Sequence, residues 1–301
     1  MCSKAEEYHS TVWERLKILL LCAAPVLLLG FLYVWGFSIP VPVLGRSYVV
    51  RIELPQGGQP LDLPEVLGPQ DKTRPLVVID AGHGGVDPGA VGPGFQEKRI
   101  VLGLAKALRD RLLEEGGVRV AMTRDDDSFV VLAERAAIAR ELDADLFVSI
   151  HADSAGEQAD VSGATIYTLS DAANSQASAR FAQRENGADV INGLDLSGQD
   201  EAVESILVEL SQRQTAARSD EFAALVVREG EGRLTFHPQP RRSAALAVLR
   251  APDVPAILYE AGFVTNPDEA KRLSSAEGRD DFAATMASAI RIFLARNAVA
   301  P

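Results

Sequence analysis

LVVID (residues 76–80), a run of apolar and mostly β-branched residues, leads into the glycine-rich loop AGHGGVDPGAVGPG (81–94) and then into EKRIVLGLAKALRDRLLEE (97–115). The first stretch is typical of a buried strand. In the third, apolar residues recur every three to four positions, which predicts an amphipathic helix that ends at the glycine pair 116–117. A strand, a loop and a helix in this order are the start of an α/β unit.

The same alternation continues along the chain. Further strands are predicted at 118–123, 145–150, 163–169 and 255–260, and further helices at 131–143 and 277–297. Nearly uninterrupted apolar strands that alternate with helices are typical of a parallel sheet buried on both faces. We therefore expect a single α/β domain over residues 75–298, with a mostly parallel twisted sheet covered by helices on both faces.

An apolar stretch at residues 18–38 precedes this domain. About 20 apolar residues suffice to cross a bilayer as a helix, and no charged residue lies between Lys17 and Arg46. We expect a cytoplasmic N-terminus at 1–17, an N-terminal transmembrane helix at 18–38 and a Pro- and Gly-rich linker at 39–74. A cleaved signal peptide is the alternative interpretation of the apolar stretch.

Charge and cysteine content narrow the possible functions. The 30 Lys and Arg residues against 42 Asp and Glu residues give a net charge of −12, which argues against a nucleic-acid partner. The two cysteines, Cys2 and Cys22, both lie near the N-terminus. The domain therefore has neither a disulfide framework nor a thiolate zinc cage, and any metal in it must be bound by histidine and carboxylate side chains.

Four such side chains fall at one predicted edge of the sheet. His83 follows the strand at 76–80, His151 follows the strand at 145–150, Glu260 ends the last strand, and Glu97 opens the helix after the glycine-rich loop. Ligands of open parallel sheets bind beyond the carboxyl ends of the strands. We therefore expect these four residues to lie near one another.

Two imidazoles and one carboxylate are a recurrent ligand set in zinc hydrolases, which keep one position open for water. His83, Glu97 and His151 fit the ligands of a Zn²⁺ ion, and Glu260 fits the base that takes the proton of the water. Each residue also has a purely structural interpretation, as a loop histidine, a first-turn glutamate or an ion-pair partner. Phosphate binding is disfavoured because the loop lacks the GxxxxGK[ST] and GxGxxG patterns.

Two aspartates are accessory candidates. Asp80 could orient a ligand histidine by accepting a hydrogen bond from its ring. Asp153, two residues after His151, could approach the metal when the site is closed. The alternatives are a strand-end residue bonded to local backbone for Asp80 and a loop cap for Asp153.

Three motifs resemble those of one known family: DAGHGGVDPGAVGPGFQEKRIVL (80–102), SIHADS (149–154) and EAGFVTNPDE (260–269). They resemble the zinc-dependent N-acetylmuramoyl-L-alanine amidases of the amidase-3 type, and in particular the cell-division amidases of Gram-negative bacteria. The resemblance implies zinc ligands at His83, Glu97 and His151 and a catalytic glutamate at Glu260. It also implies hydrolysis of the amide between N-acetylmuramic acid and L-alanine in peptidoglycan, by a periplasmic domain. Relatives are often released into the periplasm, whereas the apolar stretch at 18–38 predicts that this domain stays anchored to the inner membrane.

The segment at about 185–235 resembles the regulatory insert of the division amidases. Its sequence predicts a helix at 199–213 with one apolar stripe. The resemblance implies that this helix closes the zinc cleft until an activator with a LytM-type domain binds, with Glu204 or else Glu201 capping the metal. A helix that merely packs on the domain is the alternative. For the whole protein, the alternatives are a non-catalytic peptidoglycan-binding or regulatory protein and a zinc hydrolase for another amide.

Overall fold

The computed structural model describes residue 17 and residues 61–156, 161–188, 190–191, 194–195 and 206–297. The predicted membrane segment at 18–38, most of the linker, Glu201 and Glu204 lie outside these residues. In the described part of the chain, no helix is long and apolar enough to cross a bilayer.

A six-stranded sheet, in the order β4-β1-β5-β10-β6-β9, forms the centre of the domain. Four strands run parallel to one another: β4 (Arg119–Met122), β1 (Leu76–Ala81), β5 (Leu146–Asp153) and β10 (Ala256–Phe263). β6 (Ala164–Leu169) is antiparallel to β10, and β9 (Phe236–Ala244) is parallel to β6. The prediction of a mostly parallel sheet is confirmed, and β9 is a strand that the sequence pattern did not predict.

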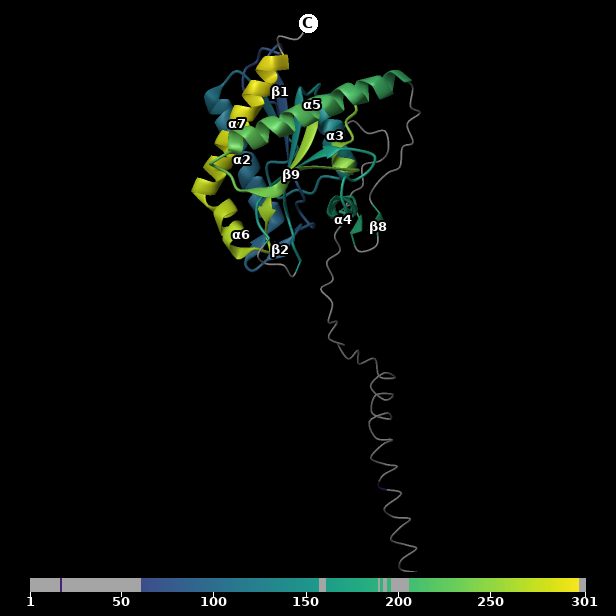
Figure 1. The fold of residues 1–301 in the computed structure, drawn as a ribbon, viewed down its shortest axis with the longest axis vertical. Coiled ribbons are helices and arrows are strands. Elements are labelled where there is room, and N and C mark those ends of the chain that lie inside the picture. Colours follow the sequence, from purple (N-terminus) through teal and green to yellow (C-terminus); the bar gives the residue numbers. More distant parts are fainter. Residues whose placement is uncertain are drawn as a thin grey trace, which may run out of the picture. The chain divides into compact units, whose positions relative to one another are not determined.

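Helices cover both faces of the sheet (Figure 1). Along β1, Val77 and Ile79 lie in one apolar layer and Leu76 and Val78 in the other, because successive side chains of a strand point to opposite faces. The first layer is completed by α2 (Glu97–Glu115), α5 (Ile206–Gly230), α6 (Pro267–Ser274) and α7 (Ala276–Asn297), and the second by α3 (Leu132–Glu141), α4 (Gln176–Glu185) and the short 3₁₀ helix η1 (Ala247–Leu249).

The helix predicted at 199–213 continues beyond its predicted end, since α5 extends to Gly230. Phe222 and Val226 of α5 are fully buried, and the ring of Phe222 lies 5.2 Å from that of Phe293 in α7. These apolar residues continue the helical pattern and pack in the first layer. The second half of α5 therefore packs in the domain core.

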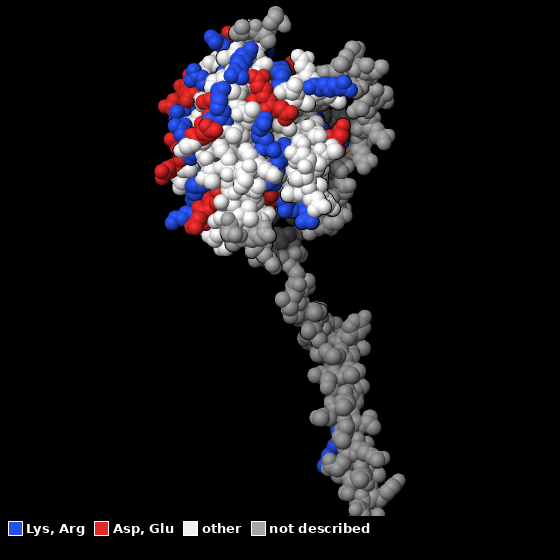
Figure 2. Space-filling view, in the orientation of Figure 1, with Lys and Arg blue, Asp and Glu red and all other residues white. Residues whose placement is uncertain are grey.

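Two small hairpins complete the described elements. β2 (Val91–Gly92) pairs with β3 (Phe95–Gln96) and leads the glycine-rich loop into α2, whereas β7 (Val190–Ile191) pairs with β8 (Leu194–Asp195) after α4. On the face seen in Figure 2, Lys and Arg side chains are interspersed with Asp and Glu side chains. Such a mixture does not build the one-sign field that attracts a polyanion over long range.

Candidate metal centre

The carboxyl edge of the sheet brings His83, Glu97 and His151 together. The Oε1 atom of Glu97 lies 3.1 Å from Nε2 of His83 and 3.2 Å from Nδ1 of His151. The two imidazole rings are 4.9 Å apart and nearly perpendicular, and all three side chains are buried. Three residues that are far apart in the sequence thus direct ligand atoms to one point.

Backbone amides fix the carboxylate of Glu97. Its Oε1 accepts from the N–H of Ala152 at 2.8 Å, and its Oε2 accepts from the N–H of Ala90 at 2.8 Å. The first of these donors follows His151 in β5, and the second belongs to the glycine-rich loop. Since Glu97 is the first residue of α2, the helix start, the loop and β5 are tied together at the ligand side chain.

The close approach of His151 to the glycine-rich loop requires a glycine at residue 82. A Cβ atom at Gly82 would lie 2.4 Å from Cε1 of His151, well inside the van der Waals distance. The imidazole of His151 therefore packs directly against the loop backbone. It can take this position only because Gly82 has no side chain.

We expect Gly82→Ala to displace the His151 ring and to weaken metal binding by about tenfold or more, as changes around ligands commonly do. Competition with a chromophoric chelator measures this. Gly103→Ala is the matched control, because a Cβ there has an ordinary contact with Arg279 at 3.4 Å and alanine suits a helix. Equal zinc affinities for the wild type and Gly82→Ala would contradict the packing argument.

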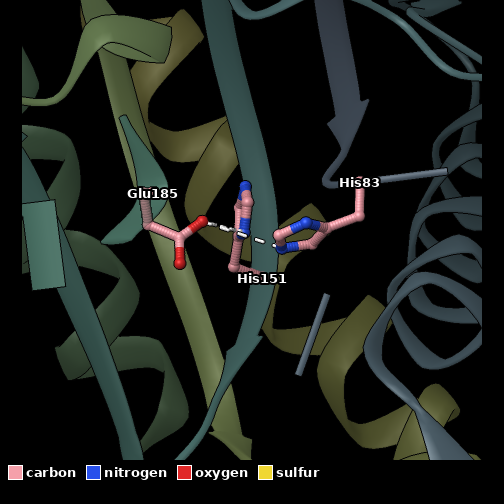
Figure 3. Close-up of side chains that lie close together, drawn as sticks. All are labelled: His83, His151 and Glu185. Carbon is pink, nitrogen blue, oxygen red and sulfur yellow. Dashed lines mark ion pairs between the residues drawn. The ribbon is translucent and has the colours of Figure 1, made fainter. Parts of the chain in front are cut away.

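A fourth ligand candidate, Glu185, was not predicted. It is the last residue of α4, and its Oε2 lies 3.1 Å from Nδ1 of His151 and 3.7 Å from Nε2 of His83. Figure 3 shows this carboxylate directed at the two imidazoles. His83, His151 and Glu185 each offer one ligand atom, and these atoms lie within 4.8 Å of one another. In the sequence, residue 185 is only the start of the predicted insert, and no local pattern indicated that its side chain would be a ligand.

The donor set fits a divalent metal such as zinc. The Nδ1–H of His83 donates to Asp87 Oδ2 at 2.7 Å, which leaves the lone pair of Nε2 facing the centre. Both Nε2 of His83 and Oε2 of Glu185 are buried and have no hydrogen-bond partner among the described residues. Buried polar atoms are rarely left unpaired without a reason, and a bound cation would satisfy both atoms.

The electrostatics of the cluster also favour positive charge at this point. Burial acts to lower the pKa of His83, but Glu97 and Asp87 raise it to about 10. Burial likewise opposes the charged form of His151, yet Glu185 and Glu97 raise its pKa to about 10. The carboxylates thus create a negative potential at the two buried imidazoles. This potential stabilises a positive charge between them, either a proton or a metal cation.

Glu260 lies beside the cluster on the neighbouring strand. It occupies the register position opposite His151, so the two side chains share one face of the sheet. Glu260 is 4% exposed, and neither carboxylate oxygen has a hydrogen-bond partner among the described residues. Burial raises its pKa well above the usual range, and the charges of Asp153, Glu97 and Glu185 add to the effect. A buried carboxyl group with free oxygens is poised for proton transfer.

Asp153 contacts the end of α4. Its carboxylate accepts from Nη2 of Arg184, the residue that precedes Glu185. Burial raises the pKa of Asp153 to about 6, against the opposing effect of Arg184. Asp153, Arg184 and Glu185 line one side of a cleft of about 260 Å³ that reaches His83 and Glu97. Asp153 thus lies at the metal cleft, and its described hydrogen-bond donors are Arg184 and the N–H of Ser154.

Asp80 has different partners from the histidine we expected. It is fully buried, and it accepts hydrogen bonds from Thr123, Ser149 and Arg135. It lies on the same sheet face as the site, but none of its hydrogen bonds to described residues comes from a ligand histidine. The donors to Asp80 come from the residue that follows β4, from β5 and from α3.

Taken together, the fold and the cluster define an α/β domain built around a candidate metal centre of two imidazoles and two carboxylates. The chain belongs to the N-acetylmuramoyl-L-alanine amidase family, Amidase_3, which it matches over residues 77–291. That match includes every residue of the site discussed above.

Individual relatives are similar over the same region. AmiC of Neisseria meningitidis serogroup B is 40% identical over 224 residues, which are 73% of this chain and 53% of the relative. AmiA of Escherichia coli K12 is 36% identical over 217 residues, which are 71% of this chain and 74% of the relative. The chain therefore spans about half to three quarters of the length of these relatives. The solved structure of the amidase AmiC2 of Nostoc punctiforme matches with a TM-score of 0.53 and 29% identity, over 74% of this chain and 98% of that chain.

Proposed function

We propose that this chain is a zinc-dependent amidase that cleaves the bond between N-acetylmuramic acid and L-alanine in peptidoglycan. The observation that carries the proposal is the convergence of His83, Glu97 and His151 on one buried point, with Glu260 at the register position opposite His151. The family match supports the choice of this amide among possible substrates.

In this proposal His83, Glu97 and His151 hold the zinc. Zinc bound there would lower the pKa of water toward about 7 and polarise the scissile carbonyl. Asp87 fixes the tautomer of His83, and the amides of Ala90 and Ala152 fix the carboxylate of Glu97. These contacts keep the ligand atoms in place while the substrate enters.

Glu260 acts as the base and then as the acid. Its carboxylate accepts a proton from the attacking water and passes it to the leaving nitrogen of L-alanine, so the amine departs neutral. The high pKa that burial gives Glu260 suits the second transfer, and positive charge at the metal centre favours the carboxylate needed for the first.

We propose that the C-terminal end of α4 closes the site. The two imidazoles, Glu97 and Glu185 would give the zinc four protein ligands, whereas catalytic zinc sites have three and keep the fourth position open for water. Glu185 therefore competes with water, and the bond between Arg184 and Asp153 holds the same end of α4 at the cleft. Among the described residues, Glu185 is the one that we propose for the capping role. The predicted Glu204 and Glu201 lie outside the described residues.

Opening such a site requires a partner that prefers the displaced helix. We propose an activator with a LytM-type domain for this role, and a function in cell-wall remodelling and daughter-cell separation. Peptidoglycan lies outside the inner membrane, so the domain would act in the periplasm, held to that membrane by residues 18–38.

Removal of the Glu185 carboxylate should raise basal activity. Hydrogen bonds to charged groups contribute about 1.5–3 kcal/mol, so Glu185→Ala is expected to release dye from labelled cell walls roughly 10- to 100-fold faster than the wild type. Release must stop with a zinc chelator and return with added zinc. Gln183→Ala, an exposed position on the same helix, is the matched control. Equal basal rates in all three chains would rule out capping by Glu185.

A further inference from the structure

Two buried arginines gather the backbone carbonyl groups of the loop that carries His83. Arg124 donates from Nε to the carbonyl of Ala81 at 2.8 Å and from Nη2 to that of Gly82 at 2.7 Å. Arg135 donates from Nη1 to the carbonyl of Ala81 at 2.9 Å and from Nη2 to that of His83 at 3.0 Å. Three consecutive carbonyls thus face guanidinium groups that come from outside the loop.

The loop needs this support because His83 has an unusual backbone. Its φ is +58°, in the left-handed region that a residue with a Cβ rarely adopts. That conformation costs roughly 1–2 kcal/mol and persists only where the surroundings enforce it. Arg135 donates to the carbonyl of His83 itself. The backbone conformation at this residue sets the direction of its imidazole.

Asp80 fixes the guanidinium group of Arg135. The two side chains are 0% and 3% exposed, and Asp80 Oδ1 lies 2.9 Å from Nη1 of Arg135. The same carboxylate accepts from the hydroxyl groups of Thr123 and Ser149, both at 2.6 Å. Asp80 therefore joins β1, β5 and the residue that follows β4 to Arg135. Nε of Arg135 also donates to the carbonyl of Val130 at 3.0 Å.

Asp80 and Arg135 connect the strands of the core to the backbone around the metal centre, through hydrogen bonds that involve no ligand ring. Ser149 lies two residues before His151 on the same face of β5, so Asp80 is tied to the strand of one ligand. Arg135 is tied to the backbone of the other ligand, His83. A planar guanidinium with several donors in fixed directions can hold Asp80 and the loop carbonyls at once, and an ammonium group cannot.

We propose that Arg135 is a positioning residue of the metal centre, which holds the main-chain carbonyl of His83 and so directs the His83 imidazole at Glu97 and His151, with Asp80 as its anchor. The inference rests on the metal site of the proposed function and adds a residue to which that function assigns no role. It also gives Asp80 a purpose that differs from the direct bond to a histidine expected from the sequence.

The test is the zinc affinity of the full chain, measured by competition with a chromophoric chelator, which does not depend on hydrolysis. Changes in the partners of metal ligands typically weaken binding about 10- to 100-fold. We expect such a loss for Arg135→Met and a smaller one for Arg135→Lys, which keeps the charge. Arg140→Met is the matched control on the same helix, because Arg140 is exposed and pairs with Asp253 at 2.8 Å. Wild-type affinity in folded Arg135→Met, or in Arg135→Lys if the first variant does not fold, would overturn the proposal.

A double-mutant cycle separates positioning from general loosening of the fold. In a His83→Ala background, Arg135→Met should cost no further zinc affinity, because the ring it directs is gone. An equal fold-loss in both backgrounds would overturn the proposal. Failure of the wild-type chain to bind zinc at all would instead overturn the proposed function, and this inference with it.

Discussion

Glu260→Gln is expected to keep its zinc and to lose amide hydrolysis by about 10²–10⁴-fold, the range that general acid–base groups contribute. The amide of glutamine has nearly the shape of the carboxyl group but cannot take up and return a proton. The variant should fold at least as well as the wild type, because the buried carboxyl group at this position has no hydrogen-bond partner among the described residues. Rates of cell-wall hydrolysis and zinc content are measured on the same preparations.

Glu141→Gln provides the control for this substitution, since Glu141 is exposed at the end of α3. It should leave both hydrolysis and zinc content unchanged. Because the wild type is expected to be closed, each variant is also compared in the Glu185→Ala background. Near-normal turnover of Glu260→Gln with zinc still bound would show that Glu260 has only a structural role.

The combined substitution of His83 and His151 by alanine should abolish stable zinc binding. It removes two of the three ligands and leaves only carboxylates at the site, which cannot hold the metal as tightly as two imidazoles and a carboxylate do. Metal analysis after dialysis should find less than about a tenth of the wild-type zinc, consistent with a loss of 10–100-fold or more for damage at a ligand site.

His237→Ala is the matched control for the histidine variants. His237 lies in β9, and its ring contacts Arg242 and the N–H of Gln239 rather than the cluster. This variant should retain its zinc. Full occupancy in the double variant would show that the metal binds elsewhere in the chain.

Which residues lie at the carboxyl edge of the sheet was predictable, because the apolar pattern of each strand determines it. Apolar runs give the strands, alternation gives the face of each side chain, and parallel strands end at a common edge. His83, His151 and Glu260 each follow or end such a run, so the sequence placed them near one another. Glu97 followed from the helix that starts directly after the loop.

The position of Glu185 could not be predicted in this way, because long-range packing sets it. The ring of Phe181 in α4 stacks on Tyr167 of β6 at 4.4 Å, and the side-chain amide of Asn186 donates to the carbonyl of Ala245 at 2.8 Å. These contacts position the C-terminal end of α4, and with it Glu185, next to the two imidazoles. The contact of Asp80 with Arg135 is long-range in the same sense, since the two residues are 55 positions apart.

The strand β9 was missed for a different reason. Its sequence, FHPQPRRSA, contains two prolines and two arginines and lacks the apolar alternation of a typical strand. It lies at the edge of the sheet, where one side of the strand needs no hydrogen-bonding partner and proline is tolerated. Local pattern is a weak guide to such edge strands.

The products released from purified peptidoglycan test the central claim most directly. The wild-type and Glu185→Ala chains are incubated with intact sacculi, with and without a zinc chelator, and soluble products are identified by mass spectrometry. We predict stem peptides with a free L-alanine amino group and glycan strands with free lactyl carboxylates, faster with Glu185→Ala and absent with the chelator. Glycan fragments, peptides cut at another bond, or release that the chelator does not affect would contradict the account.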